Sequence, residues 1–262
     1  MNESWSNELL KDGRVGMSKI KTVKCSELLN TPCNNWLDEV VAAVSVAPYY
    51  RDDAVVIFNA DCREIVPHIP KAHLLLTDPP YGIGSLMKGG NNTGHWNTLS
   101  NGNDWDMEIP DLTPVLSVSE KSIVWGGNYF PLPPCRGVLA WRKLNAVPTQ
   151  ADMEIAWTTL DIPAKMFAHA SGGAMKRHGH PTQKPLALML WCIGLAGDVQ
   201  TIIDPFAGSG TTGRAAKDLG RKCVMIERVE RYCEISAKRM QQEVLPLRFG
   251  CRADDEWNTR TQ

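Results

Sequence analysis

The chain has 262 residues, which is enough for one α/β domain with additions, since an ordinary domain has about 150 residues. Hydrophobic residues make up 43% and charged residues 22% of the sequence, near globular averages, which excludes a disordered, collagen-like or coiled-coil chain. No apolar run approaches the roughly 18 residues of a membrane span, and the polar, acidic N-terminus lacks the pattern of a secretory signal. We therefore expect a cytoplasmic protein.

Charge is balanced overall but not locally. The 28 Lys and Arg residues against 29 Asp and Glu residues give a net charge of −1, which argues against coating nucleic acid by bulk charge. Residues 162–197, however, contain no acidic residue and carry Lys165, Lys176 and Arg177. Such a stretch favours a local surface that faces phosphates, with an accidental gap in acidic residues as the alternative. The eight cysteines form no C-x-x-C pair or zinc-like cluster, so we expect reduced thiols and no metal site.

The predicted elements begin after an N-terminal extension, residues 1–48, which contains one short helix at 36–46. Seven strand-like apolar runs follow, with helix-length segments between several of them. This alternation predicts an α/β fold with a parallel sheet and helices on both faces, and the directly joined fourth and fifth strands predict an antiparallel hairpin at one edge. The expected strands are residues 54–58, 73–77, 122–125, 137–141, 153–157, 200–203 and 222–226, and the expected helices are 109–118, 185–196, 211–219 and 230–242.

The sixth predicted strand leads into a glycine-rich loop with Gly208, Gly210 and Gly213 in the spacing G-x-G-x-x-G. Glycines at this spacing let a backbone turn tightly and approach a ligand, and Glu227, which ends the next strand, can accept hydrogen bonds from a ribose diol. No Gly-Lys-Ser/Thr follows, which excludes a P-loop. The glycines permit a dinucleotide or S-adenosylmethionine. Asp204, at the mouth of the strand, would repel a pyrophosphate but suits an ammonium group, so it favours S-adenosyl-L-methionine.

A second motif, Asp78-Pro79-Pro80-Tyr81, closes the second predicted strand. A carboxylate at this end of a strand lies at the crevice where open α/β sheets bind ligands, and the prolines fix the following backbone in an extended shape. An exocyclic amine of a base can donate one hydrogen to Asp78 and the other to the carbonyl of Pro79, which leaves its lone pair aimed at a methyl donor. Tyr81 offers a flat face to a base taken out of its helix. The alternative is an ordinary turn with Tyr81 in the core.

The two motifs together, in this order, resemble the amino-group DNA methyltransferases, and the order, with the catalytic motif first, is similar to their permuted beta class. Residues 122–130, SIVWGGNYF, further resemble a phage and prophage branch of that family. The resemblance implies a seven-stranded, circularly permuted S-adenosylmethionine-dependent methyltransferase (Rossmann-like) fold over residues 49–245. A short target-recognition segment would lie near residues 165–180, and residues 246–262 would form a C-terminal tail.

The resemblance also implies site residues. The catalytic motif would be Asp78 to Tyr81. In the run HPTQKP at residues 180–185, Thr182 and Lys184 would hold the methionine carboxylate of the cofactor, and Asp61 would contact its adenine. The cofactor-binding set implied in this way is Asp61, Thr182, Lys184, Asp204, Phe206, Gly208, Gly210, Thr211 and Glu227.

The implied activity is site-specific methyl transfer to N6 of adenine in duplex DNA by base flipping, since Asp-Pro-Pro-Tyr is the usual adenine form of the motif in this family. N4 of cytosine is the alternative, because both bases present an amine next to a ring nitrogen. A nicotinamide-dependent oxidoreductase would leave Asp78 to Tyr81 without a role, and the intact motif argues against an inactive DNA-binding homologue. Duplex DNA is the expected partner, with or without a cognate restriction enzyme.

Overall fold

A computed structural model describes residues 36–82, 109–146, 151–171 and 183–242, and the backbone of two short strands before them. These strands, β1 (Trp5–Leu9) and β2 (Val15–Lys19), pair antiparallel in a separate sheet. The predicted C-terminal tail, residues 246–262, lies outside the described residues. None of the helices in the described ranges has the length and apolarity needed to cross a membrane.

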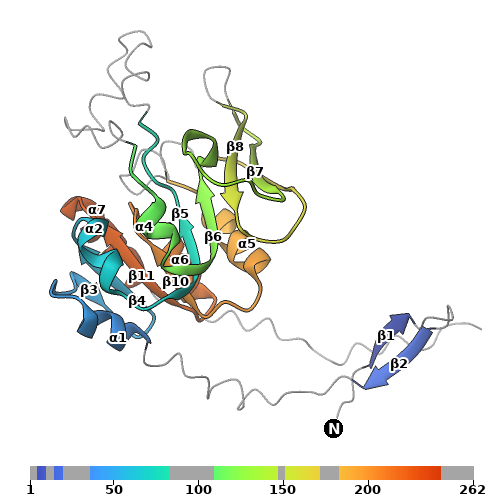
Figure 1. The fold of residues 1–262 in the computed structure, drawn as a ribbon, viewed down its shortest axis with the longest axis horizontal. Coiled ribbons are helices and arrows are strands. Elements are labelled where there is room, and N and C mark those ends of the chain that lie inside the picture. Colours follow the sequence, from blue (N-terminus) through green and yellow to red (C-terminus); the bar gives the residue numbers. More distant parts are fainter. Residues whose placement is uncertain are drawn as a thin grey trace, which may run out of the picture.

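A nine-stranded sheet forms the centre of the fold (Figure 1). Its five consecutive strands from β4 to β6 run parallel, β3 and β8 pair antiparallel with their neighbours, and β9 runs parallel to β7. The spatial order is β3 (Tyr50–Arg51), β4 (Val55–Asn59), β11 (Lys222–Glu227), β10 (Thr201–Asp204), β5 (Ala72–Thr77), β6 (Ser119–Trp125), β8 (Met153–Thr158), β7 (Val138–Lys143) and β9 (Lys165–His169).

The observed sheet differs from the predicted one in two details. All seven predicted strands are present, and β7 and β8 form the predicted antiparallel hairpin. Two strands of this sheet were missed. Strand β3 has two residues, too short to give a pattern, and β9 begins and ends with the polar residues Lys165 and His169, so its apolar run is only three residues long. Because β9 pairs with β7, it forms the edge of the sheet in place of the hairpin.

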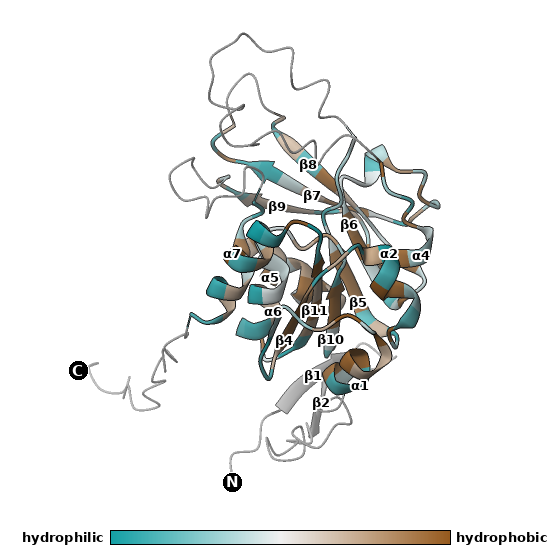
Figure 2. Cartoon of the chain, turned by 90° about the vertical axis from the view of Figure 1, so that its left-hand side faces the viewer, coloured by the Kyte–Doolittle hydropathy of each residue, from teal (hydrophilic) through white to brown (hydrophobic). Residues whose placement is uncertain are grey.

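Helices cover both faces of the sheet, as predicted, because alternate residues of a strand point to opposite sides. Along β4, Val55 and Ile57 pack into one core cluster, and Val56 and Phe58 pack into the other. Figure 2 shows the central strands β4, β10 and β11 as strongly apolar, which fits strands that are buried on both faces. The first cluster includes residues of α5 (Leu186–Ala196), α6 (Thr211–Asp218) and α7 (Glu230–Met240), and the second includes residues of α1 (Trp36–Ala43), α2 (Cys62–Ile65), η3 (Val66–His68) and α4 (Thr113–Leu116).

Two helices differ from the prediction. Helix α1 buries Trp36, Leu37 and Val40 in the second core cluster, so the core includes a helix that the sequence interpretation placed in the N-terminal extension. The helix expected over residues 109–118 is reduced to the four residues of α4, which carries Pro114 in its first turn. A proline is accepted in the first turn of a helix but not further inside it, so a longer helix could not run through this position.

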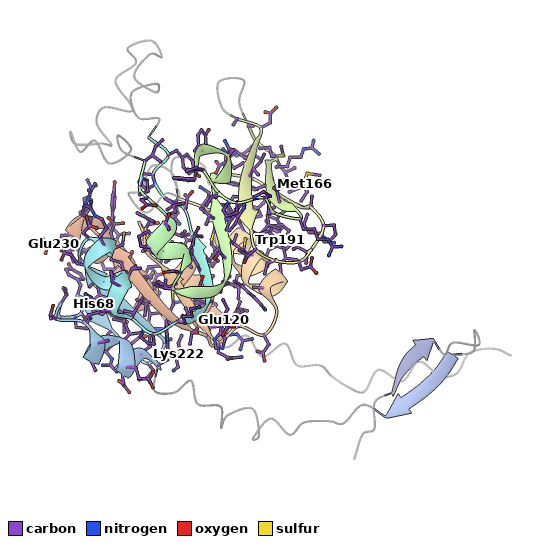
Figure 3. All side chains as sticks on the ribbon, in the orientation of Figure 1. His68, Glu120, Met166, Trp191, Lys222 and Glu230 are labelled. Carbon is purple, nitrogen blue, oxygen red and sulfur yellow. The ribbon has the colours of Figure 1, made fainter. Side chains whose placement is uncertain are left out.

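The carboxyl ends of the parallel strands meet at one edge of the sheet. In Figure 3, Glu120 and Lys222 mark the beginnings of β6 and β11 at the lower side of the domain, so the ends of these strands lie at the upper side. This edge carries four acidic residues, each at the end of one of four adjacent strands: Asp61 after β4, Glu227 on β11, Asp204 on β10 and Asp78 after β5.

Candidate active site

The two motifs predicted from the sequence lie side by side, because β5 and β10 are hydrogen-bonded neighbours. The hydroxyl of Thr77, the residue before Asp78, donates to Oδ1 of Asp204 at 2.7 Å. The glycine-rich loop and the Asp-Pro-Pro-Tyr segment therefore lie next to each other at the same edge of the sheet.

Asp204 is a buried carboxylate, and no ion pair to it is present among the described residues. Burial raises its pKa to about 6, against the lowering effect of hydrogen bonds from Thr212, Thr77 and the amide of Phe206. Burying a carboxylate without a counter-charge is unfavourable, and a bound cation would relieve the cost. This chemistry fits the ammonium group of S-adenosyl-L-methionine, as the sequence predicted.

The glycine loop is held in place by Glu227. Its Oε2 accepts a hydrogen bond from the amide of Gly208 and its Oε1 accepts one from the amide of Val229, both at 2.8 Å. Gly208 and Gly210 have φ angles of 51° and 74°, in the left-handed region that glycine adopts without strain. A Cβ on Gly210 would lie 2.8 Å from Oγ of Ser236, so the loop also needs glycine to pack against α7.

The remaining predicted cofactor residues surround this loop. Asp61 caps α2 through the amide of Arg63 at 2.9 Å and follows β4, the neighbour of β11. Thr211 begins α6, is buried, and its Oγ1 accepts a hydrogen bond from Arg239 at 3.0 Å. Phe206 is partly buried against the second core cluster.

Three predicted residues, Thr182, Lys176 and Arg177, lie outside the described residues. Lys165, the third member of the predicted DNA-binding set, is exposed at the start of β9. The predicted target-recognition segment, residues 165–180, is described only as far as residue 171, and its first five residues form β9.

Asp78 is engaged on both carboxylate oxygens. The Tyr81 hydroxyl donates to Oδ1 and the ammonium of Lys184 donates to Oδ2, each at 2.5 Å. The Lys184 ammonium also lies 3.0 Å from Oε2 of Glu154 on β8, and Oε1 of Glu154 lies 2.6 Å from the ammonium of Lys143. The structure thus places Lys184, for which the sequence predicted a contact to the cofactor carboxylate, against the carboxylate of the Asp-Pro-Pro-Tyr motif.

The electrostatics of this cluster favour its charged form. Burial lowers the pKa of Lys184, but Asp78, Tyr81 and Glu154 together raise it well above its usual value. Burial alone would raise the pKa of Glu154, but the ammonium groups of Lys184 and Lys143 lower it by more, so its pKa lies below the usual value. Sequence reasoning missed Glu154 and Lys143, although a charged residue inside a predicted buried strand is a signal that Glu154 has a specific partner.

The Tyr81 ring is fixed on several sides. It stacks on Tyr129 with ring centroids 4.7 Å apart and an interplanar angle of 15°, and it meets the edge of Phe130 at 6.3 Å. Gly126, with a φ angle of 69°, lies so close that a Cβ there would overlap the Tyr81 ring. Tyr129, in η5 (Gly127–Tyr129), is 42% exposed, so the aromatic stack continues from the motif to the protein surface.

Comparison with known proteins finds a family match over part of the chain. The sequence model of the DNA methylase family matches residues 119–238. The chain is 34% identical over 131 residues to the type II methyltransferase M2.MboI of Moraxella bovis, covering 49% of this chain and 43% of that protein. It is 39% identical over 67 residues to the type II methyltransferase M.HinfI of Haemophilus influenzae, covering 25% of this chain and 19% of that protein. The matched region spans less than half the length of either relative.

A solved structure shows the same fold. The PvuII DNA methyltransferase (cytosine-N4-specific) superposes with a TM-score of 0.55 at 17% identity, covering 77% of this chain and 92% of that one. The family match is therefore to DNA methylases of the N6 and N4 type and extends over residues 119–238. The predicted family, cofactor and methyltransferase fold are confirmed at this level; the phage and prophage branch stays a prediction.

Proposed function

We propose that this chain transfers a methyl group from S-adenosyl-L-methionine to N6 of adenine in duplex DNA, in the cytoplasm of a bacterial or phage-infected cell. The observation that carries the proposal is the placement of Asp78 and Asp204 at the ends of adjacent parallel strands, linked by the Thr77 hydroxyl. One carboxylate can bind a methyl donor and the other can bind a methyl acceptor next to it.

Asp204 would bind the cofactor ammonium, because it is buried and lacks a counter-charge among the described residues. Gly208 and Gly210 would let the loop backbone approach the cofactor, with Glu227 at the ribose and Asp61 at the adenine. When bound, S-adenosyl-L-methionine supplies a methyl group already activated on its sulfonium, so the protein needs no covalent intermediate.

Asp78 would orient the target amine. One of its carboxylate oxygens accepts one amine hydrogen, and the carbonyl of Pro79 accepts the other, so that the nitrogen lone pair points at the methyl donor. The proton is lost after the nitrogen attacks, and Asp78 or solvent takes it. Pro79 is buried and Tyr81 is held by Asp78 and Tyr129, so the groups that position the base are rigid before it arrives.

The choice of adenine is supported by the first residue of the motif, which is Asp78 and not a serine. In this family the aspartate form is usual for adenine and the serine form is commoner for cytosine N4. Lys165, Lys176 and Arg177 would bind the DNA phosphates, and the flipped base would lie beside Tyr81.

The test is nucleoside mass spectrometry. The purified chain is incubated with labelled S-adenosyl-L-methionine and genomic duplex DNA from a methylation-deficient host, and the DNA is digested to nucleosides. We expect label in N6-methyladenine. Label in N4-methylcytosine alone would overturn the adenine assignment but not the methyl transfer, and DNA without label would overturn the proposed activity.

A further inference from the structure

A partly buried chain of four alternating charges runs from β7 to the Asp-Pro-Pro-Tyr motif, in the order Lys143, Glu154, Lys184 and Asp78. Their side chains are 13%, 23%, 8% and 27% exposed, and successive charged atoms lie 2.6, 3.0 and 2.5 Å apart. The charges of the two ammonium groups and two carboxylates sum to zero, and each charge has an opposite neighbour that offsets the free-energy cost of its partial burial. The chain therefore behaves as one electrostatic unit, and a change at one end affects the other.

The arrangement in the structure conflicts with methyl transfer at Asp78. Each of its oxygens already accepts a short hydrogen bond, one from Tyr81 and one from Lys184. The target amine needs one of these oxygens and gains positive charge as it is methylated. An ammonium held beside it would repel that charge strongly in a buried site. The Lys184 ammonium must therefore leave Asp78 before the chemical step.

Glu154 offers the place to which this ammonium can move. Its Oε1 is held by Lys143, whereas its Oε2 is buried and, among the described residues, accepts no hydrogen bond of good geometry. The Lys184 ammonium is already 3.0 Å from that oxygen, so a change of side-chain torsion is sufficient to align the two.

We propose that Glu154 is a positioning residue that takes over the Lys184 ammonium when the target amine binds Asp78, and that Lys143 holds Glu154 in place for this exchange. The inference rests on the proposed function and adds a residue on β8 to it. Before the amine binds, Lys184 supplies the counter-charge for Asp78. Afterwards the amine occupies Asp78 and Glu154 supplies the counter-charge for Lys184.

The test is a single-turnover measurement of methyl transfer for Glu154→Gln at saturating DNA and cofactor. Among the described residues, the variant leaves Asp78 as the one carboxylate beside Lys184. The ammonium should therefore stay on Asp78, and the rate constant should fall roughly tenfold or more. DNA and cofactor affinities should change less than about threefold. Glu120→Gln, on an exposed residue at the opposite end of the sheet, is the matched control and should retain the wild-type rate.

Further variants test whether Glu154 accepts the Lys184 ammonium or only stabilises the fold. Lys143→Gln combined with Glu154→Gln restores the charge balance but not the acceptor, so the rate should stay low. Glu154→Asp keeps a carboxylate and should recover part of the rate, which also tests the inference if Glu154→Gln does not fold. A wild-type rate in Glu154→Gln, or full recovery in the double variant, would overturn the inference while wild-type methylation stands. Wild-type protein without activity would overturn the proposed function as well.

Discussion

Asp204→Asn should stabilise the ligand-free protein at pH 8 and weaken its binding of S-adenosyl-L-methionine. Burial raises the pKa of Asp204 from 3.8 to about 6, so ionising it at pH 8 costs the folded state about 3 kcal/mol. Asparagine has nearly the same shape, carries no charge, and keeps an oxygen that can accept the hydrogen bonds of Thr77 and Phe206. The variant should recover up to that amount of unfolding free energy.

The sign of the pH dependence follows from the direction of the shift. Because the folded pKa lies above the unfolded one, the folded state binds the proton more tightly. The stability from this group is fully present below about pH 4 and is lost as the pH rises through about 6. The gain from Asp204→Asn should therefore shrink from about 3 kcal/mol at pH 8 to about 1 kcal/mol at pH 4.5.

Urea unfolding of both proteins at pH 8 and pH 4.5 measures this gain, and isothermal titration at pH 8 measures cofactor affinity. The control is Asp161→Asn, whose carboxylate is 88% exposed and should change the free energy of unfolding by less than about 0.5 kcal/mol. Loss of stability at pH 8, or the same gain at both pH values, would refute the burial argument. A stabilised variant with unchanged cofactor affinity would show that Asp204 is not the ammonium contact.

Two further predictions concern the DNA side of the site. Gly126→Ala should lower the methylation rate roughly tenfold, because the added Cβ would displace the Tyr81 ring at a backbone position with a φ angle of 69°. The control is Gly194→Ala, where a Cβ meets nothing within 4 Å. Equal methylation rates in the two variants would contradict the packing argument. Neutralising Lys165, Lys176 and Arg177 together should weaken DNA binding and reduce the slope of log affinity against log salt by about one unit per contact, and an unchanged slope would remove these residues from the interface.

The sequence allowed prediction of those parts of the candidate site for which a local motif and the sheet topology point to the same edge. Asp78 and Asp204 each end an apolar strand, and in a parallel sheet such ends share one edge, so their proximity could be inferred without coordinates. The contact between Lys184 and Glu154 could not, because it joins the segment before α5 to an antiparallel strand whose register no short-range pattern encodes. The same holds for Tyr129, whose stacking on Tyr81 depends on the turn after β6.

The most direct test of the account compares label transfer to duplex DNA by the wild type and by Asp78→Ala, with cofactor binding measured on the same samples. In the proposed mechanism, Asp78 binds the acceptor amine and Asp204 binds the cofactor. We predict that Asp78→Ala binds S-adenosyl-L-methionine within about threefold of the wild type and transfers no detectable label. Label transfer at the wild-type rate, or a loss of cofactor affinity as large as that of Asp204→Asn, would contradict the account.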